Sequence, residues 1–314
     1  MRLIVILLAA SVFAPADDSA FDGHLAAGKL ALQQSRYPEA RKQLDAAIKD
    51  AASFDAYDLR VAAVLEAYSD WNALQGQHAE AESLERRVVR IRERHLGPEN
   101  PALSPYLRRL AAELRAEART ELAEPILLRS LSIGETTYGA EGLELIPDLD
   151  NLAALYQSMK RVEDAERNWR RVISIREGKS GPDNFEIASS LVSLGSLYEK
   201  AGKAEQAEQS YTRALAISEK KLGAESYGIT GILDRLGLLF NQNRKYERAE
   251  PYFQRSLAIR ERTLGPMHSE VAPALDNLAL TFYRQKKFLE AEPLYKRALA
   301  LWEFSQGPDS LFTA

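Results

Sequence analysis

The sequence predicts an all-α fold in which antiparallel helix pairs stack into a solenoid, and three observations support this. Glycines recur every 42 residues, at Gly97, Gly139, Gly181, Gly223, Gly265 and Gly307, and proline follows four of the six. Alanine, glutamate and arginine recur with the same spacing. The apolar residues within each unit follow a helical period. Self-similarity at a fixed period is typical of repeat proteins, so a stacked array is expected.

Four columns of residues stay in register across six units. The alanine column contains Ala81, Ala123, Ala165, Ala207, Ala249 and Ala291, and a glutamate follows each member. Six residues after each alanine comes an arginine: Arg87, Arg129, Arg171, Arg213, Arg255 and Arg297. A second glutamate column contains Glu93, Glu135, Glu177, Glu219, Glu261 and Glu303. The recurrence of the glutamates in every unit favours pairing with basic residues on adjoining helices over a catalytic role.

One unit reads as two helices. The first has apolar residues at i, i+3, i+4 and i+7, namely Leu149, Leu152, Ala153 and Tyr156. A polar break at Lys160-Arg161 separates it from a second helix with the same period, which contains Ala165, Trp169, Val172 and Ile173. The alanine column has a physical reason, because two helices that cross closely leave room only for a small side chain at the crossing.

The units define the expected organisation of the chain. An N-terminal pair over residues 21–54 matches more loosely, since Ala40 lies 41 residues before Ala81 and Arg41 replaces the glutamate. Six 42-residue units follow over residues 55–306, and residues 307–314 form a tail. Seven helix pairs are therefore expected, with no shift in composition that would mark a second domain.

The N-terminus predicts a secretory signal peptide over residues 1–16, followed by a short linker over 17–20. Arg2 precedes an unbroken apolar and small run from Leu3 to Phe13, and Ala14-Pro15-Ala16 fits a small-x-small cleavage site. The run is about half the length that a membrane-spanning helix needs. The alternative is a frayed hydrophobic tail. We expect an exported protein, periplasmic or secreted, with no stable membrane insertion after cleavage.

Composition argues against several kinds of chemistry. The chain has 314 residues, a net charge of −4 and no long basic run, so nucleic acid is a poor candidate for a partner. It contains no cysteine, which excludes disulfides and thiolate metal sites. The four histidines are not at metal-ligand spacing, and Gly202-Lys203 lacks the Ser/Thr of a phosphate-binding loop. We therefore expect no enzyme activity, no cofactor and no metal.

The spacing resembles the tetratricopeptide repeat (TPR). Two units carry the pattern clearly: Leu191, Leu194, Gly195, Tyr198, Ala207, Tyr211 and Ala214, and Leu275, Leu278, Ala279, Phe282, Ala291, Tyr295 and Ala298. The eight extra residues per unit, and strings such as Leu275-Asp276-Asn277-Leu278-Ala279-Leu280, are similar to kinesin light chain repeats. The resemblance implies a right-handed superhelical solenoid, and a non-catalytic scaffold that binds a protein or peptide partner.

By that resemblance, the first helix of each pair would line a concave groove. The candidate groove residues are Arg109, Asn151, Ser193, Arg235 and Asn277, and the next turn adds Asn241 and Tyr283. Related repeats use asparagine at the positions of Asn151 and Asn277 to hold a peptide backbone, which an amide suits because it both donates and accepts. The alternative is an ordinary solvated helix face. Variation at these positions against a fixed scaffold favours binding of one specific partner.

The last helix suggests a second function, self-assembly into a structural homo-oligomer. Trp302 and Phe304 lie at i and i+2, so both rings cannot face the preceding helix. At least one ring is expected on a terminal docking face.

Overall fold

The computed structural model describes residues 18–306, which form α-helices and short 3₁₀ turns and no strand. The predicted signal peptide and C-terminal tail lie outside the described residues. The chain divides into two compact units at Arg161/Val162. The all-α helical-repeat fold predicted from the 42-residue period is confirmed.

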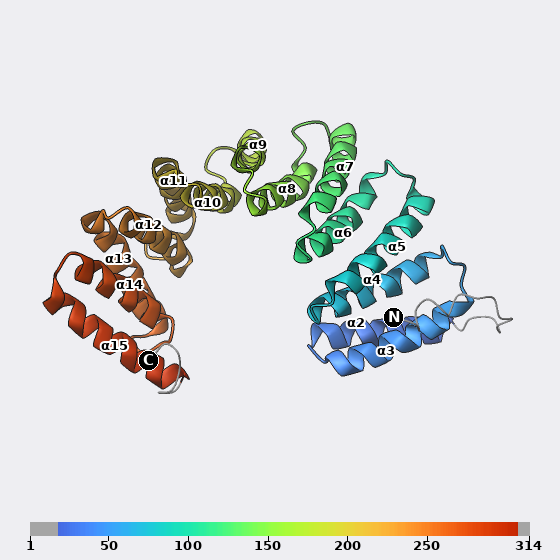
Figure 1. Ribbon diagram of the computed structural model, residues 1–314, viewed down its shortest axis with the longest axis horizontal. Helices are drawn as coiled ribbons and strands as arrows, with labels where there is room; N and C mark the ends of the chain where they lie inside the picture. The colour runs from blue at the N-terminus through green and yellow to red at the C-terminus, as the bar shows by residue number, and fades with distance from the viewer. Residues whose placement is uncertain (1–17, 307–314) are drawn as a thin grey trace. The chain divides into compact units, whose positions relative to one another are not determined.

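Unit 1 contains three helix pairs and a further helix (Figure 1). The pairs are α2 (Asp18–Gln33) with α3 (Tyr37–Asp50), α4 (Leu59–Leu74) with α5 (His78–Leu96), and α6 (Ser104–Ala116) with α7 (Thr120–Tyr138). Helix α8 (Ile146–Ser158) follows, and 3₁₀ turns at Ala51–Ser53, Pro101–Leu103 and Leu143–Leu145 lie in the loops. Helix α2 already includes residues 18–20, which were expected to belong to a linker.

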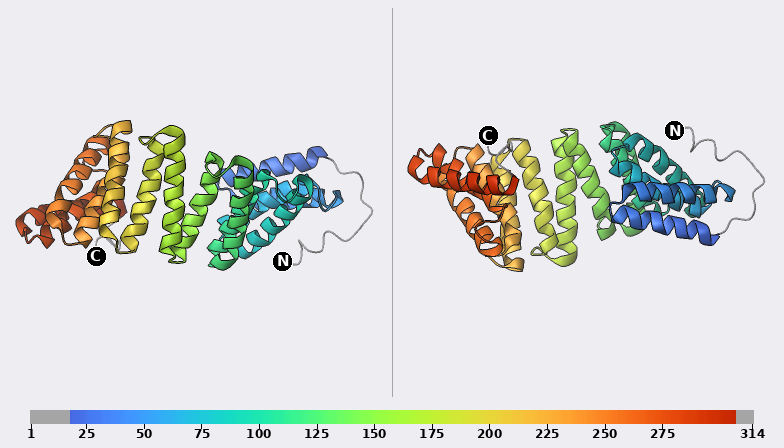
Figure 2. Two further views of the ribbon diagram at one scale, coloured as in Figure 1. Left: turned by 90° about the horizontal axis from the view of Figure 1, so that it is seen from above. Right: turned by 90° about the horizontal axis from the view of Figure 1, so that it is seen from below.

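Unit 2 begins with a single helix and continues with three pairs, whose successive helices lie side by side (Figure 2). Helix α9 (Val162–Ser180) precedes α10 (Phe185–Lys200) with α11 (Ala204–Leu222), α12 (Thr230–Gln242) with α13 (Tyr246–Leu264), and α14 (Val271–Arg284) with α15 (Phe288–Gln306). A 3₁₀ turn at Tyr227–Ile229 leads into α12.

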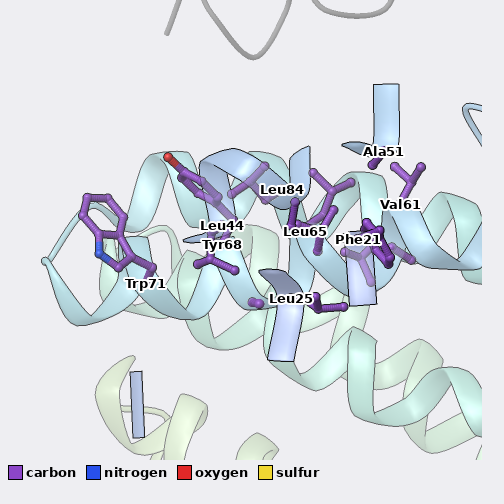
Figure 3. Close-up of a cluster of buried hydrophobic side chains, with 14 of the residues drawn as sticks. Phe21, Leu25, Leu44, Ala51, Val61, Leu65, Tyr68, Trp71 and Leu84 are labelled. Carbon is purple, nitrogen blue, oxygen red and sulfur yellow. The ribbon is translucent and has the colours of Figure 1, made fainter. Parts of the chain in front are cut away.

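The core of the first two pairs shows how unit 1 is held together (Figure 3). Phe21 of α2 contacts Phe54 edge-on, with ring centroids 5.2 Å apart, and Leu44 of α3 is fully buried. Val61, Leu65 and Tyr68 of α4 join the same cluster. The more loosely matching N-terminal pair is therefore part of the same apolar core as the pair that follows it.

The alanine column lies at helix crossings, as expected. All six members are buried, with at most 2% of the residue exposed. In α10 and α12 glycine supplies the second small residue of the crossing. A Cβ atom at Gly195 would lie 2.6 Å from the Tyr211 ring, and one at Gly237 would lie 2.6 Å from the Phe253 ring. The close crossing therefore depends on missing side-chain volume on both helices.

Candidate functional site

The first helices of unit 2 are linked directly to one another. Gln242 of α12 donates from Nε2 to Glu199 Oε1 of α10 at 3.0 Å. Asn241, also of α12, donates from Nδ2 to Thr281 Oγ1 of α14 at 2.9 Å. Helices α10, α12 and α14 thus form one continuous surface, which we call the first-helix face, and it carries the unit 2 members of the predicted groove.

The arginine column and the second glutamate column pair between successive second helices. The four pairs within the two units are Arg129–Glu93, Arg213–Glu177, Arg255–Glu219 and Arg297–Glu261. Each arginine also donates to a carbonyl oxygen of the loop before its own pair: Pro98, Pro182, Ala224 or Pro266. These residues hold neighbouring repeats in register, which explains why they recur unchanged.

The first glutamate column is also engaged between repeats. Glu82 accepts from Arg119 at 3.2 Å, Glu124 from Arg161 at 2.8 Å and Glu250 from Lys287 at 3.0 Å. Glu208 accepts from Arg248 at 2.6 Å, and Glu166 lies 3.6 Å from Lys203. These contacts support a structural role for both glutamate columns.

Arg109 is held by carboxylates of its own unit. Its guanidinium donates to Glu85 Oε1 at 2.6 Å, to Asp70 Oδ1 at 2.8 Å and to the Glu66 carbonyl oxygen at 3.3 Å. Glu85 is only 1% exposed, and burial raises the pKa of its carboxyl although Arg109 opposes the shift. The guanidinium mainly compensates a buried acid, which leaves it less suited to a peptide.

The Glu85–Arg109 pair could have been recognised from the repeat. Glu85 occupies the column that otherwise holds large apolar residues, namely Leu127, Trp169, Tyr211, Phe253 and Tyr295. A carboxylate in a buried column needs a cationic partner, because an unpaired buried charge is strongly unfavourable. Arg109 supplies that partner.

Two of the predicted asparagines use their amides within the chain. Asn151 donates from Nδ2 to the carbonyl of Pro147, one turn earlier in α8, at 2.7 Å. Asn241 donates to Thr281, as described above, while its Oδ1 atom is buried without a hydrogen-bond partner. Asn241 therefore retains an acceptor oxygen but offers it to an enclosed space.

The remaining predicted groove residues are more accessible. Ser193 and Asn277 are half-buried, and Arg235 is exposed. Arg235 lies beside the hydroxyl of Tyr211, which donates to Glu199 Oε2 at 2.8 Å. The Tyr283 residue is 52% exposed.

Aspartates next to the groove column connect the two helices of a pair. Asp234 of α12 accepts from Ser256 at 2.6 Å and from Arg260 at 2.7 Å, both on α13. Asp276 of α14 accepts from Trp302 Nε1 of α15 at 2.9 Å. The Trp302 ring therefore lies against its own helix pair, whereas Phe304 is 80% exposed.

The described residues offer little else in the way of reactive sites. Nowhere between residues 18 and 306 do three or more His, Asp or Glu side chains converge as a metal site requires. Over the same range, every helix is too short or too polar to cross a bilayer.

Comparison with known families points to one kind of repeat. A tetratricopeptide repeat model matches residues 145–220, 229–303 and 270–314, and a second tetratricopeptide repeat model matches residues 71–102. Together the matches cover more than half of the chain. No curated protein sequence matches it.

Solved structures with the same architecture include kinesin light chain-like repeats. The nearly identical TPR-like repeats of a Podospora anserina kinesin light chain superpose with a TM-score of 0.59 at 20% identity, covering 66% of this chain and 99% of that one. BtubC (BKLC) from P. vanneervenii gives 0.61 at 22% identity, covering 75% and 93%. The apo quorum sensor NprR from B. thuringiensis gives 0.55 at 14% identity, covering 90% and 87%. At these identities the likeness concerns the fold.

Proposed function

Because the chain belongs to the tetratricopeptide repeat family, we propose that it is a non-catalytic scaffold that binds a peptide or helix of a partner protein. The partner lies on the first-helix face. The observation that supports this most is that the polar residues fall into two groups. The repeated charges bond to one another between repeats, whereas the first-helix positions differ from pair to pair.

The accessible members of the face define the proposed binding residues. Arg235 offers a charged donor, and the half-buried Asn277 offers an amide on the adjacent helix. Ser193 of α10 is a half-buried member of the same face. Arg109, Asn151 and Asn241 contribute less, because their side chains are engaged within the chain. Solved relatives include a protein described as a quorum sensor, and recognition of another molecule fits the role proposed here.

Export is part of the proposal. The signal-peptide pattern at residues 1–16 supports a location in the periplasm or outside the cell. Mass spectrometry of the exported protein should find an N-terminus at Asp17. Intact residues 1–16 on a cytosolic protein would contradict export.

A triple variant tests the groove. Ser193→Ala, Arg235→Ala and Asn277→Ala together should abolish co-purification of the partner that cross-linking identifies in the native cell. The matched control replaces three exposed second-helix residues, Arg167, Gln254 and Lys296, by alanine and should leave co-purification unchanged. Equal recovery of the partner with both triple variants would contradict the assignment.

Self-association through α15 is a second candidate, favoured by one observation. Tyr295 and Leu299 are 37% and 41% exposed, whereas the equivalent Phe253 and Leu257 are 0% and 8% exposed. A second copy of the chain would cover these residues together with Phe304. Light scattering should then report a dimer, and Phe304→Lys should return it to a monomer; a monomer in both cases would rule this candidate out.

A further inference from the structure

The end of α14 and the start of α15, on either side of the turn that joins them, carry three exposed apolar side chains. The exposed fractions are 52% for Tyr283, 55% for Phe288 and 86% for Leu289. The two rings meet edge-on with centroids 5.4 Å apart. We call these three residues the turn patch. Clustered exposed apolar residues of this kind usually mark an interaction site.

Leu289 breaks the repeat at a position where the repeat favours an acid. The equivalent residues of the four preceding units are Glu121, Glu163, Glu205 and Glu247, each in the first turn of its helix, and the first 42-residue unit has Ala79. An acid there is stabilised by the helix dipole, which a leucine is not. All four glutamates are exposed, although each belongs to a helix that is followed by another pair. This position is therefore exposed in other repeats as well, and a leucine here adds nothing to the packing of the fold.

Basic residues surround the turn patch. Arg284 at the end of α14 and Lys286 of the turn are exposed, and so is Arg244 of the turn between α12 and α13. The two turns are adjacent, because Gln285 and Lys287 both donate to Glu250 at 3.0 Å. Arg244 and Lys286 have φ values of 58° and 63°, where the equivalent position of the turn before holds Gly202. Cations are thus present where the backbone favours glycine.

Acidic side chains on this edge are fewer. Glu247 and Glu290 are exposed close to the turns, while Glu250 is neutralised by Lys287. The edge therefore combines aromatic and aliphatic side chains with an excess of positive charge, although the whole chain carries −4.

We propose that the turn patch docks the protein on a lipid surface with anionic headgroups. Three side chains are too few for a stable protein interface, which buries about 1,000 Å² or more. They suit shallow insertion at the headgroup boundary, where aromatic rings settle and each nearby Lys or Arg adds attraction to anionic lipid. The contact is peripheral, and Tyr283 is the one residue of the turn patch that also belongs to the predicted groove.

Vesicle binding by the full chain tests the proposal. The chain should co-sediment with vesicles of phosphatidylcholine mixed with phosphatidylglycerol, and much less with phosphatidylcholine alone. High salt should weaken the binding, because it screens the headgroup charge. Leu289→Glu restores the residue of the repeat and should lower the affinity about tenfold, on the order of one buried leucine.

The control is Met267→Glu. Met267 is 61% exposed in the loop at the opposite end of the helix pairs of the same unit, so its substitution should leave vesicle binding unchanged. Circular dichroism should show both variants as helical as the parent. Failure of the parent to bind anionic vesicles, or equal binding by Leu289→Glu, would overturn the proposal. A protein partner lost only in Leu289→Glu, without vesicle binding, would assign the patch to that partner instead.

Discussion

The Tyr211 ring packs directly over Gly195, so that a Cβ atom added at Gly195 would lie 2.6 Å from Tyr211 Cε1. Tyr211 is fully buried, and its hydroxyl donates to Glu199 at 2.8 Å. The glycine thus lets a large side chain of α11 cross α10 and reach the residues next to Arg235. The packing of Tyr211 over Gly195 therefore also positions polar groups on the first-helix face.

Gly195→Ala should destabilise unit 2 by about 1–3 kcal/mol, because the new methyl group overpacks the crossing. Glycine in a helix is ordinarily less stable than alanine by about 0.5–1 kcal/mol, so a Gly→Ala substitution without overpacking would raise the free energy of unfolding. The control is Gly178→Ala in α9, where nothing lies within 4 Å and a small gain is expected. Chemical denaturation followed by circular dichroism measures both. Stabilisation by Gly195→Ala would refute the close crossing.

Ala118→Gly should stabilise unit 1 by roughly 0.5–1 kcal/mol. Ala118 has a φ of 59°, in the left-handed region, which costs a residue with a side chain about 1–2 kcal/mol. Glycine removes this cost, but its greater conformational entropy in the unfolded chain offsets part of the gain. Gly202 occupies the same position two repeats later with a φ of 72°, so Gly202→Ala should lose about 1 kcal/mol. Melting shifts of the same sign in the two variants would contradict this account.

Ala207→Leu should destabilise more than Glu208→Ala. Ala207 is fully buried at a helix crossing, and overpacking there costs about 1–3 kcal/mol. Glu208 pairs with Arg248, and the two side chains are 29% and 50% exposed, so its loss should cost about 1 kcal/mol or less. Melting temperatures in the reverse order would show that the alanine column does not mark a tight contact.

Arg109→Ala should cost about 3 kcal/mol at neutral pH, because it leaves Glu85 charged and buried without a cation. Burial raises the pKa of Glu85 in the folded state, so folding is favoured when the carboxyl binds a proton. The loss of unfolding free energy in the variant should therefore become smaller as the pH falls below the pKa of Glu85 in the folded state. Adding Glu85→Gln should recover stability at neutral pH. A deficit that is constant with pH would exclude this role of Arg109.

The repeat columns made the scaffold predictable from sequence. The contacts and exposure of individual groove residues could not be predicted in the same way. Arg129 and Glu93 recur with a fixed spacing of 36 residues, so comparison of units reveals their pairing. Arg109 is engaged by Asp70 and Glu85, and this set of three residues occurs in one repeat only. Periodicity reports what units share. Comparison of the units marks Glu85 as an unusual residue in a buried column, but the packed structure was needed to place Asp70 beside the same guanidinium.

The most direct test of the proposed scaffold function is site-specific photo-cross-linking in the native cell. A photoreactive residue in place of Arg235 on the first-helix face should form a cross-link to one discrete protein. The same residue in place of Arg167, whose side chain is 76% exposed on the second helix α9, should not. Cross-linking of that protein from Arg167 alone, or equally from both positions, would contradict binding at the first-helix face.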